Sequence, residues 1–243
     1  MKLFTEHFNL IYVDGFRQSE VKTGDVEYLP IAYTRAVVSS LIFLTDVPKS
    51  ILLIGLGGAT FPSYLKKHFS HSKIEVVELF QGMVTVAEKY GNFKQDENCI
   101  VIIDDAADFI NKNHNKKQYD LIIQDGCSIA PCPLLILDTF KKLSSMLTPN
   151  GIYIQNQIGM DPPVIKNIKD SFKDFYYVES KSINQVIVAH NSDRIYTKEN
   201  LILRAQMYQA AENPTFNVVE EYARNYKRLT DIMINSENYL EYK

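Results

Sequence analysis

The chain has 243 residues, a formal net charge of -3 and 46% hydrophobic residues. This length allows one sizeable domain with a small appendage, and the near-neutral charge gives no electrostatic footprint for nucleic acid or an anionic membrane. No run approaches the roughly 18 apolar residues of a membrane span, and the first residues lack the apolar core of a signal sequence. We therefore expect a cytoplasmic globular protein with neither a nucleic-acid nor a membrane partner.

The cysteine content is low and indicates a reducing compartment. Cys99, Cys127 and Cys132 are the only cysteines, and we expect them to be free thiols. Cys127 and Cys132 are spaced like half of a zinc site, but no partner pair or close histidine completes it. The sequence thus predicts no bound metal.

The N-terminal residues have the pattern of a small β unit. "NLIYV" and "FRQSEVK" flank Asp14-Gly15, a pair typical of hairpin turns. The segment "YTRAVVSSLIFL" that follows has apolar residues at helical spacing and ends near Pro48. We assign residues 1–33 to an N-terminal β-hairpin unit.

From Ser50 onward, predicted strands and helices alternate. Five strands are predicted: "SILLIGLG", "KIEVVEL", "CIVIIDD", "YDLIIQDG" and "GIYIQNQIG". Continuous Val/Ile/Leu strands separated by amphipathic helices indicate a parallel sheet covered on both faces. Right-handed crossovers then require a doubly wound α/β arrangement.

The end of the sheet is predicted to be antiparallel. "FYYVESKSI" and "NQVIVAHN" are separated by too few residues for a parallel return, which needs a crossover of about a dozen residues. The prediction is a mostly parallel, seven-stranded Rossmann-like sheet ending in an antiparallel hairpin, over residues 34–195. This pattern is typical of class I S-adenosylmethionine (AdoMet) transferases. Residues 196–243 are predicted to form a helical extension packed on that domain.

A possible nucleotide site begins at the glycines after the first of these strands. Gly55, Gly57 and Gly58 allow a ligand to approach the backbone closely, although a tight turn without a ligand would use the same residues. Glu78 ends the second strand, where a carboxylate can accept hydrogen bonds from ribose hydroxyls. Its alternative is a surface glutamate at a strand end.

Two further strand ends carry carboxylates. Asp104 and Asp105 follow the third strand, where an acidic side chain can accept a hydrogen bond from an adenine amino group or cap the next helix. We favour Asp105 for the adenine, because Asp104 could supply the cap. Asp125 follows the fourth strand, where it could orient an amine nucleophile and take its proton, or serve only as a turn residue. These positions predict an adenosine pocket and an adjacent reaction centre along one sheet edge.

The histidines carry no predicted chemistry. His68, His71 and His114 lie in polar, lysine-rich stretches and are expected on the surface. The sequence offers no histidine-based catalytic group.

Several segments, in order, resemble the polyamine aminopropyltransferases, the spermidine synthase-like proteins. They are "GFRQSEV", "EYLPIAY", "ILLIGLGGAT", "VVELF", "IIDDAADF", "YDLIIQDG" and "LTPNGIYIQNQ". The resemblance covers about residues 10 to 190 and includes the N-terminal β unit. It implies a homodimer.

The resemblance also implies roles for individual residues. The nucleoside-binding residues are Gln18, Glu78, Asp105 and Ala106; the proton acceptor is Asp125; and the residue lining the amine channel is Tyr33.

The amine side departs from the family pattern. Gly58 occupies the position of an aspartate that binds the aminopropyl amine in the family. Thr34 and Arg35 stand where the family pattern has a histidine and an acid. Ser128 stands at the second aspartate of D-x-x-D-P, where it would line the substrate site. A diamine would lose several ion pairs, each contributing about 1–3 kcal/mol when partly buried.

These departures favour one donor. Without an acid at position 58, repulsion of the methionine carboxylate of AdoMet is removed. We therefore expect methyl transfer from AdoMet to a small-molecule or amine nucleophile. The alternatives are aminopropyl transfer from decarboxylated AdoMet and a non-catalytic nucleoside-binding protein.

Overall fold

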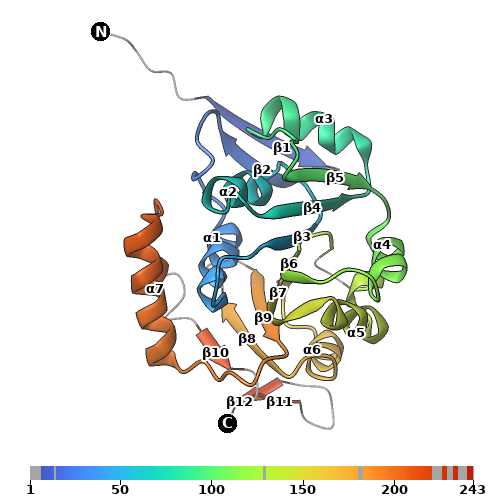
Figure 1. Cartoon of the computed structure of the whole chain (residues 1–243), viewed down its shortest axis with the longest axis vertical. Coiled ribbons are helices and arrows are strands. Elements are labelled where there is room, and N and C mark those ends of the chain that lie inside the picture. The colour runs from blue at the N-terminus through green and yellow to red at the C-terminus, as the bar shows by residue number, and fades with distance from the viewer. Residues whose placement is uncertain are drawn as a thin grey trace.

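The centre of the molecule is a twisted sheet with helices on both faces (Figure 1). A computed structural model describes residues 7–13, 15–127, 130–179, 183–220, 226–228, 232–234 and 240–242. The strand order of the sheet is β10–β8–β9–β7–β6–β3–β4–β5. In that order the strands are Tyr226–Arg228, Asp174–Glu179, Asn184–His190, Leu147–Ile158, Tyr119–Gln124, Ser50–Ile54, Lys73–Glu78 and Cys99–Ile103.

The predicted fold class is confirmed. Strands β3 to β7 pair in parallel, and β9 pairs antiparallel with both β7 and β8. The sheet has one strand more than the seven predicted, because β10 adds to β8. β8 would otherwise be an edge strand with unpaired backbone groups, which a short segment can satisfy. Three residues are too few for a periodic signal in the sequence.

The helices form two layers around this sheet. They are α1 (Ala32–Ser39), η1 (Ser40–Phe43), α2 (Thr60–His68), α3 (Gln81–Tyr90), α4 (Ala106–Asn113), η2 (Pro133–Leu135), α5 (Leu137–Ser145), α6 (Pro162–Lys169) and α7 (Lys198–Glu212). Residues of α1, α2, α3 and α7 contribute to one hydrophobic cluster, and residues of α4, α5 and α6 contribute to the other. In the described part of the chain, no helix has the length and apolar character needed to cross a bilayer.

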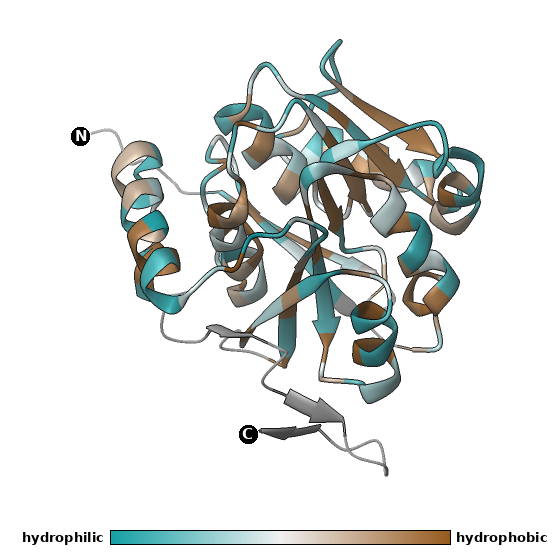
Figure 2. Cartoon of the chain, turned by 60° about the horizontal axis from the view of Figure 1, so that its bottom comes forward, coloured by the Kyte–Doolittle hydropathy of each residue, from teal (hydrophilic) through white to brown (hydrophobic). Residues whose placement is uncertain are grey.

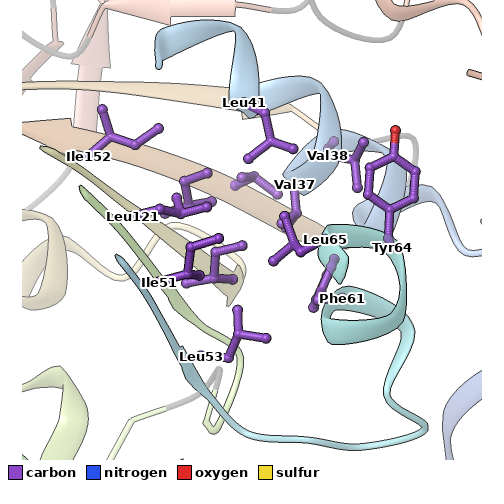
Figure 3. Close-up of a cluster of buried hydrophobic side chains, with 14 of the residues drawn as sticks. Val37, Val38, Leu41, Ile51, Leu53, Phe61, Tyr64, Leu65, Leu121 and Ile152 are labelled. Atoms are coloured by element: carbon purple, nitrogen blue, oxygen red, sulfur yellow. The ribbon is translucent and has the colours of Figure 1, made fainter. Parts of the chain in front are cut away.

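Alternate residues of β3 supply the two clusters. Ile51 and Leu53 face one cluster, and Leu52 and Ile54 face the other, as the period of two in a strand requires. Figure 3 shows the first cluster packed between the sheet and helices α1 and α2. Hydrophobic residues concentrate in the strands, whereas most helices have one polar side (Figure 2). Because β3 to β7 are parallel, their carboxyl ends lie at one edge of this buried sheet.

The N-terminal hairpin is docked on this edge. Its strands are β1 (Phe8–Val13) and β2 (Phe16–Lys22), paired antiparallel; Asp14 lies outside the described residues. Asn92 ties the hairpin to the turn after α3, since its Oδ1 accepts from the N–H of Gly24 at 2.9 Å and its Nδ2 donates to Lys22 O at 2.7 Å. The hairpin therefore has a fixed position relative to the strand ends.

The C-terminal part is only partly helical. α7 packs beside α1 and α2 (Figure 1), and β10, β11 (Ile232–Ile234) and β12 (Leu240–Tyr242) follow it, so the predicted helical extension is not helical throughout. Arg204 anchors α7 because its Nε donates to Ile42 O at 2.5 Å.

One histidine prediction is wrong. The side chain of His68 is only 5% exposed, with Nδ1 2.6 Å from Glu212 Oε2 and Nε2 3.1 Å from Glu27 Oε1. Its lysine-rich neighbours suggested solvent, but α7 covers this side of α2. His71 is exposed and His114 is half-buried.

Candidate active site

The predicted nucleoside and catalytic residues meet at the carboxyl edge of the sheet. The glycine turn follows β3, Glu78 ends β4, Asp105 follows β5 and Asp125 follows β6. Because β3 lies between β4 and β6, the turn separates Glu78 from Asp125. Open α/β sheets bind ligands at such an edge, where the strand order reverses.

The glycine turn is held close to its neighbours. Gly55 has φ +92°, and a Cβ there would lie 2.9 Å from the backbone oxygen of Asp125. Gly57 has φ +51°. Gly58 has a different constraint, since a Cβ would lie 2.5 Å from the Cβ of Ser19 on β2. Packing against Asp125 and Ser19 therefore requires glycine at positions 55 and 58, and it fixes the turn at the ends of the strands.

Glu78 links the end of β4 to this turn. Its side chain is 7% exposed, Oε2 accepts from the N–H of Leu56 at 2.9 Å, and Oε1 accepts from the N–H of Phe80 at 2.9 Å. These bonds fix the carboxylate, and each oxygen keeps a further lone pair for a ligand. The predicted ribose contact fits this geometry.

Of the two aspartates after β5, Asp105 caps the next helix and Asp104 does not. Oδ1 of Asp105 accepts from the N–H of Ala107 at 2.8 Å, so Asp105 caps α4. Asp104 instead pairs with Lys112 at 3.0 Å. The assignment of the cap to Asp104 is wrong, because the backbone at Asp105 is extended and the helix begins at Ala106. Asp105 retains Oδ2 for an adenine amino group, and that contact stays a prediction.

Asp125 is held by two side chains from distant segments. Tyr33 on α1 donates its hydroxyl to Oδ2 at 3.2 Å, and Asn156 on β7 donates Nδ2 to Oδ1 at 2.8 Å. The N–H of Asp125 donates to Ile54 O at 2.9 Å. A carboxylate fixed in this way can align an amine and accept its proton.

Burial gives the Asp125 carboxyl a pKa suited to a general base. Burial raises the pKa of Asp125 to about 6, although the hydrogen bonds from Asn156 and Tyr33 act to lower it. Burial, together with the negative charge of Asp125 and their hydrogen bond, also raises the pKa of Tyr33 well above its usual value. At neutral pH Asp125 is therefore an anion and Tyr33 a neutral donor.

Two asparagines complete this arrangement, and the sequence analysis missed them. Asn156 is 4% exposed, and its Oδ1 accepts from Asn184 Nδ2 on β9 at 2.9 Å. The signal was the polar run "QNQ" inside the otherwise apolar strand "GIYIQNQIG". Buried amides in a strand need partners, so such a run indicates a hydrogen-bond network. Asn184 orients Asn156 so that its NH₂ group faces Asp125.

The remaining predicted residues occupy mixed positions. Gln18 is exposed on β2, on the strand face opposite Ser19, and its nucleoside contact stays a prediction. Arg35 is tied to the segment before α1, since its Nη1 donates to the carbonyls of Leu29 and Pro30 at 2.7 and 3.0 Å. Ser128 lies outside the described residues.

The prediction of free thiols fails at the loop after Asp125. Cys127 and Cys132 form a disulfide, and only Cys99 is free. Their Cα atoms are 6.7 Å apart, within the reach of a disulfide. Spacing alone could not show this approach.

Other features of the surface lie away from this edge. A hollow of about 540 Å³ lies at the opposite end of the strands, lined by residues that include Thr148, Asn150 and Asn191. In the described ranges, no group of three or more His, Cys, Asp or Glu side chains is placed to hold a metal ion. The strand-end site presents carboxylates, side-chain amides and backbone groups.

The fold and this edge together have the architecture of class I transferases. Residues 31–199 match the spermine/spermidine synthase domain, and the chain belongs to that family.

Comparison with known proteins includes two kinds of transferase. The chain is 28% identical over 216 residues to the eEF1A lysine and N-terminal methyltransferase of Bos taurus, covering 78% of this chain and 31% of that protein. It is 26% identical over 204 residues to the polyamine aminopropyltransferase of Vibrio vulnificus, covering 80% of this chain and 67% of that protein. The structure of human Methyltransferase-like protein 13 in complex with SAH superposes with a TM-score of 0.69 and 25% identity, covering 74% of this chain and 91% of that one. The chain thus spans about a third of the length of the eEF1A methyltransferase.

Proposed function

We propose that this chain transfers a methyl group from AdoMet to an amine nitrogen. The observation that carries the proposal is the closed environment of Gly58. Any side chain at position 58 would collide with Ser19 and with Ile11 Cδ1, which lies 2.9 Å from the position of a Cβ. An aspartate that grips an aminopropyl amine is thereby excluded from the turn, and the negative charge that would repel the carboxylate of AdoMet is absent.

The described residues fit the donor. In this proposal the glycine turn lies against the donor, Glu78 accepts hydrogen bonds from the ribose hydroxyls, and Asp105 with Ala106 contacts the adenine. AdoMet supplies an activated methyl, so that an N–C bond forms as the S–C bond breaks and the electron pair stays on sulfur. The presence of both a methyltransferase with SAH and an aminopropyltransferase among the similar proteins supports a sulfonium nucleoside as the donor.

Asp125 orients the acceptor amine and accepts its proton. Its anionic carboxyl accepts a hydrogen bond from the amine, directs the nitrogen lone pair toward the methyl group and takes the proton released on attack. Tyr33 and Asn156 hold the two carboxyl oxygens during this step. A base with a pKa of about 6 is mostly deprotonated at neutral pH. Because this pKa lies near neutral pH, the base can also release the proton to water after the transfer.

The acceptor is inferred to be an amine, carried by a small molecule or a protein. The name of the Bos taurus relative specifies lysine and the N-terminus of eEF1A, both of which present amines. The alternative function is aminopropyl transfer from decarboxylated AdoMet, which the Vibrio vulnificus relative favours. A homodimer and a cytoplasmic location remain predictions, and sedimentation of the purified chain tests the first.

Calorimetry separates these functions. AdoMet, decarboxylated AdoMet and methylthioadenosine are titrated into the protein, and we expect AdoMet to bind more tightly than its decarboxylated form. The reverse preference would support aminopropyl transfer, and binding of none would support a non-catalytic protein.

Transfer of labelled methyl then tests the acceptor. Putrescine, a peptide with free α- and ε-amines, and the same peptide fully acetylated are the three acceptors. Label on the free peptide or putrescine, with none on the acetylated peptide, is the expected result. Label on the acetylated peptide would contradict an amine acceptor.

A further inference from the structure

Ser19 is a buried hydroxyl at the glycine turn that the reaction described above does not use. It is 6% exposed on β2, and its Oγ accepts from the N–H of Gly58 at 2.9 Å. The hydroxyl of serine can donate one hydrogen bond as well as accept. Among the residues that the structure describes, no acceptor takes the proton of this hydroxyl.

A second donor lies beside it. The N–H of Leu56 is taken by Glu78 and the N–H of Gly58 by Ser19, but the N–H of Gly57 has no acceptor in the described part of the chain. A Cβ on Gly57 would be 3.5 Å from Ser19 Oγ, so the Ser19 hydroxyl lies close to Gly57. Two neighbouring donors without a protein acceptor can together bind a carboxylate.

The position of this pair matches one end of the donor. The sulfonium of AdoMet has three substituents, of which the nucleoside is assigned to Glu78 and the methyl to the amine at Asp125. The turn lies between these residues: Leu56 bonds to Glu78, and Gly55 packs on the backbone of Asp125. The third substituent, the amino-acid chain, is left to the turn itself, where Ser19 covers it.

We propose that Ser19 and the N–H of Gly57 bind the α-carboxylate of AdoMet, which makes Ser19 a specificity-determining residue for the donor. This inference rests on the proposed function and deepens it. The N-terminal hairpin then forms one wall of the donor pocket.

The hairpin is rigid enough for this role. Asn9 donates Nδ2 to Tyr90 O at 3.0 Å, and Asn92 bonds the backbone at Lys22 and Gly24. On the other side of the turn, a Cβ on Gly91 would lie 2.3 Å from Gly58 O. The turn is therefore enclosed between the hairpin and the segment after α3, and Ser19 is held against it.

Binding of three nucleosides to Ser19→Ala tests the inference. Decarboxylated AdoMet lacks the carboxylate, and methylthioadenosine lacks the whole amino-acid chain. We expect the affinity for AdoMet to fall roughly 10- to 100-fold, the usual effect of losing a hydrogen bond to a charged group, while the other two affinities stay within about twofold. Ser19→Cys keeps a side chain of similar shape with a weak donor and should also lose affinity for AdoMet alone.

Ser63→Ala is the matched control. Ser63 is another buried serine near this turn, but its hydroxyl faces the carbonyls of Gly91 and Asn92 instead of the donor surface. It should leave all three affinities unchanged.

The outcomes distinguish the inference from the proposed function. An equal loss for all three nucleosides in Ser19→Ala, or no loss for AdoMet, overturns the carboxylate site. A wild-type protein that binds decarboxylated AdoMet more tightly than AdoMet instead overturns the proposed function. A wild-type preference for AdoMet that survives in Ser19→Ala leaves the proposed function intact and refutes the inference alone.

Discussion

Replacing Asp125 by asparagine should abolish turnover and at the same time stabilise the fold. The asparagine keeps the shape of the side chain: its oxygen can accept from Asn156 Nδ2, and its NH₂ group can donate to the hydroxyl oxygen of Tyr33, which in wild type donates to the other carboxyl oxygen. It removes the negative charge that burial opposes. Functional sites commonly carry such a cost in stability.

The magnitude follows from the pKa of Asp125. Its value is raised from 3.8 to about 6 in the folded protein. At about 1.36 kcal/mol per pKa unit, the charged form destabilises the fold by at most about 3 kcal/mol. Because the folded pKa is the higher one, this penalty is absent below pH 4, grows between pH 4 and 6, and is complete above that range.

Urea unfolding of the two proteins across pH 4 to 8 measures this effect. The difference in free energy of unfolding between Asp125→Asn and wild type should rise with pH, because all other titrating groups cancel in the difference. A difference that does not change with pH would refute the assignment of a buried, charged Asp125. Nucleoside affinity should remain nearly unchanged.

Asp120→Asn is a control of opposite sign at the other end of β6. Burial acts to raise the pKa of Asp120, but hydrogen bonds from Thr148, Lys49 and Ser50 outweigh it and hold the pKa below the usual value. This carboxylate therefore stabilises the fold above its unfolded pKa, and the stabilisation is lost as pH falls through the folded value. The variant should be destabilised at neutral pH and approach wild type in acid.

Three further results are expected. Asn156→Leu removes a hydrogen bond that lowers the pKa of Asp125, so the acid limb of the kcat/KM profile should move to higher pH; an unmoved limb would contradict the role of the asparagine. Gly91→Ala should lower the free energy of unfolding in urea by about 2 kcal/mol or more through a backbone clash, whereas Gly82→Ala, with open space on α3, should raise it by up to about 1 kcal/mol. His68→Leu should speed hydrogen exchange in α7, and unchanged exchange would show that the histidine does not hold that helix.

Much of the fold follows from local patterns. The runs of Val, Ile and Leu, the glycines after β3 and the short gap between β8 and β9 predict a doubly wound sheet with an antiparallel end. Parallel strands end at one edge, so the order of Glu78 and Asp125 along the chain already predicts a site there. β10 gives no such signal, because three residues show no period.

The missed parts of the site are contacts between distant segments. Ser19 meets Gly58 across 39 positions, and Asn156 meets Asp125 across 31. No propensity or spacing in one segment specifies which side chain of another will face it. The prediction that His68 is exposed failed for the same reason: its neighbours in sequence are lysines, whereas its neighbours in space are glutamates.

By itself, the sequence determined the class of sheet, the edge where the predicted site residues lie and the absence of an acid at position 58. Only the tertiary structure decided that no side chain fits at Gly58, that Asp125 is held by Tyr33 and Asn156, and that Cys127 and Cys132 are bonded. The reason is physical: backbone periodicity is a local property, whereas steric exclusion, burial and the resulting pKa depend on which segments pack together.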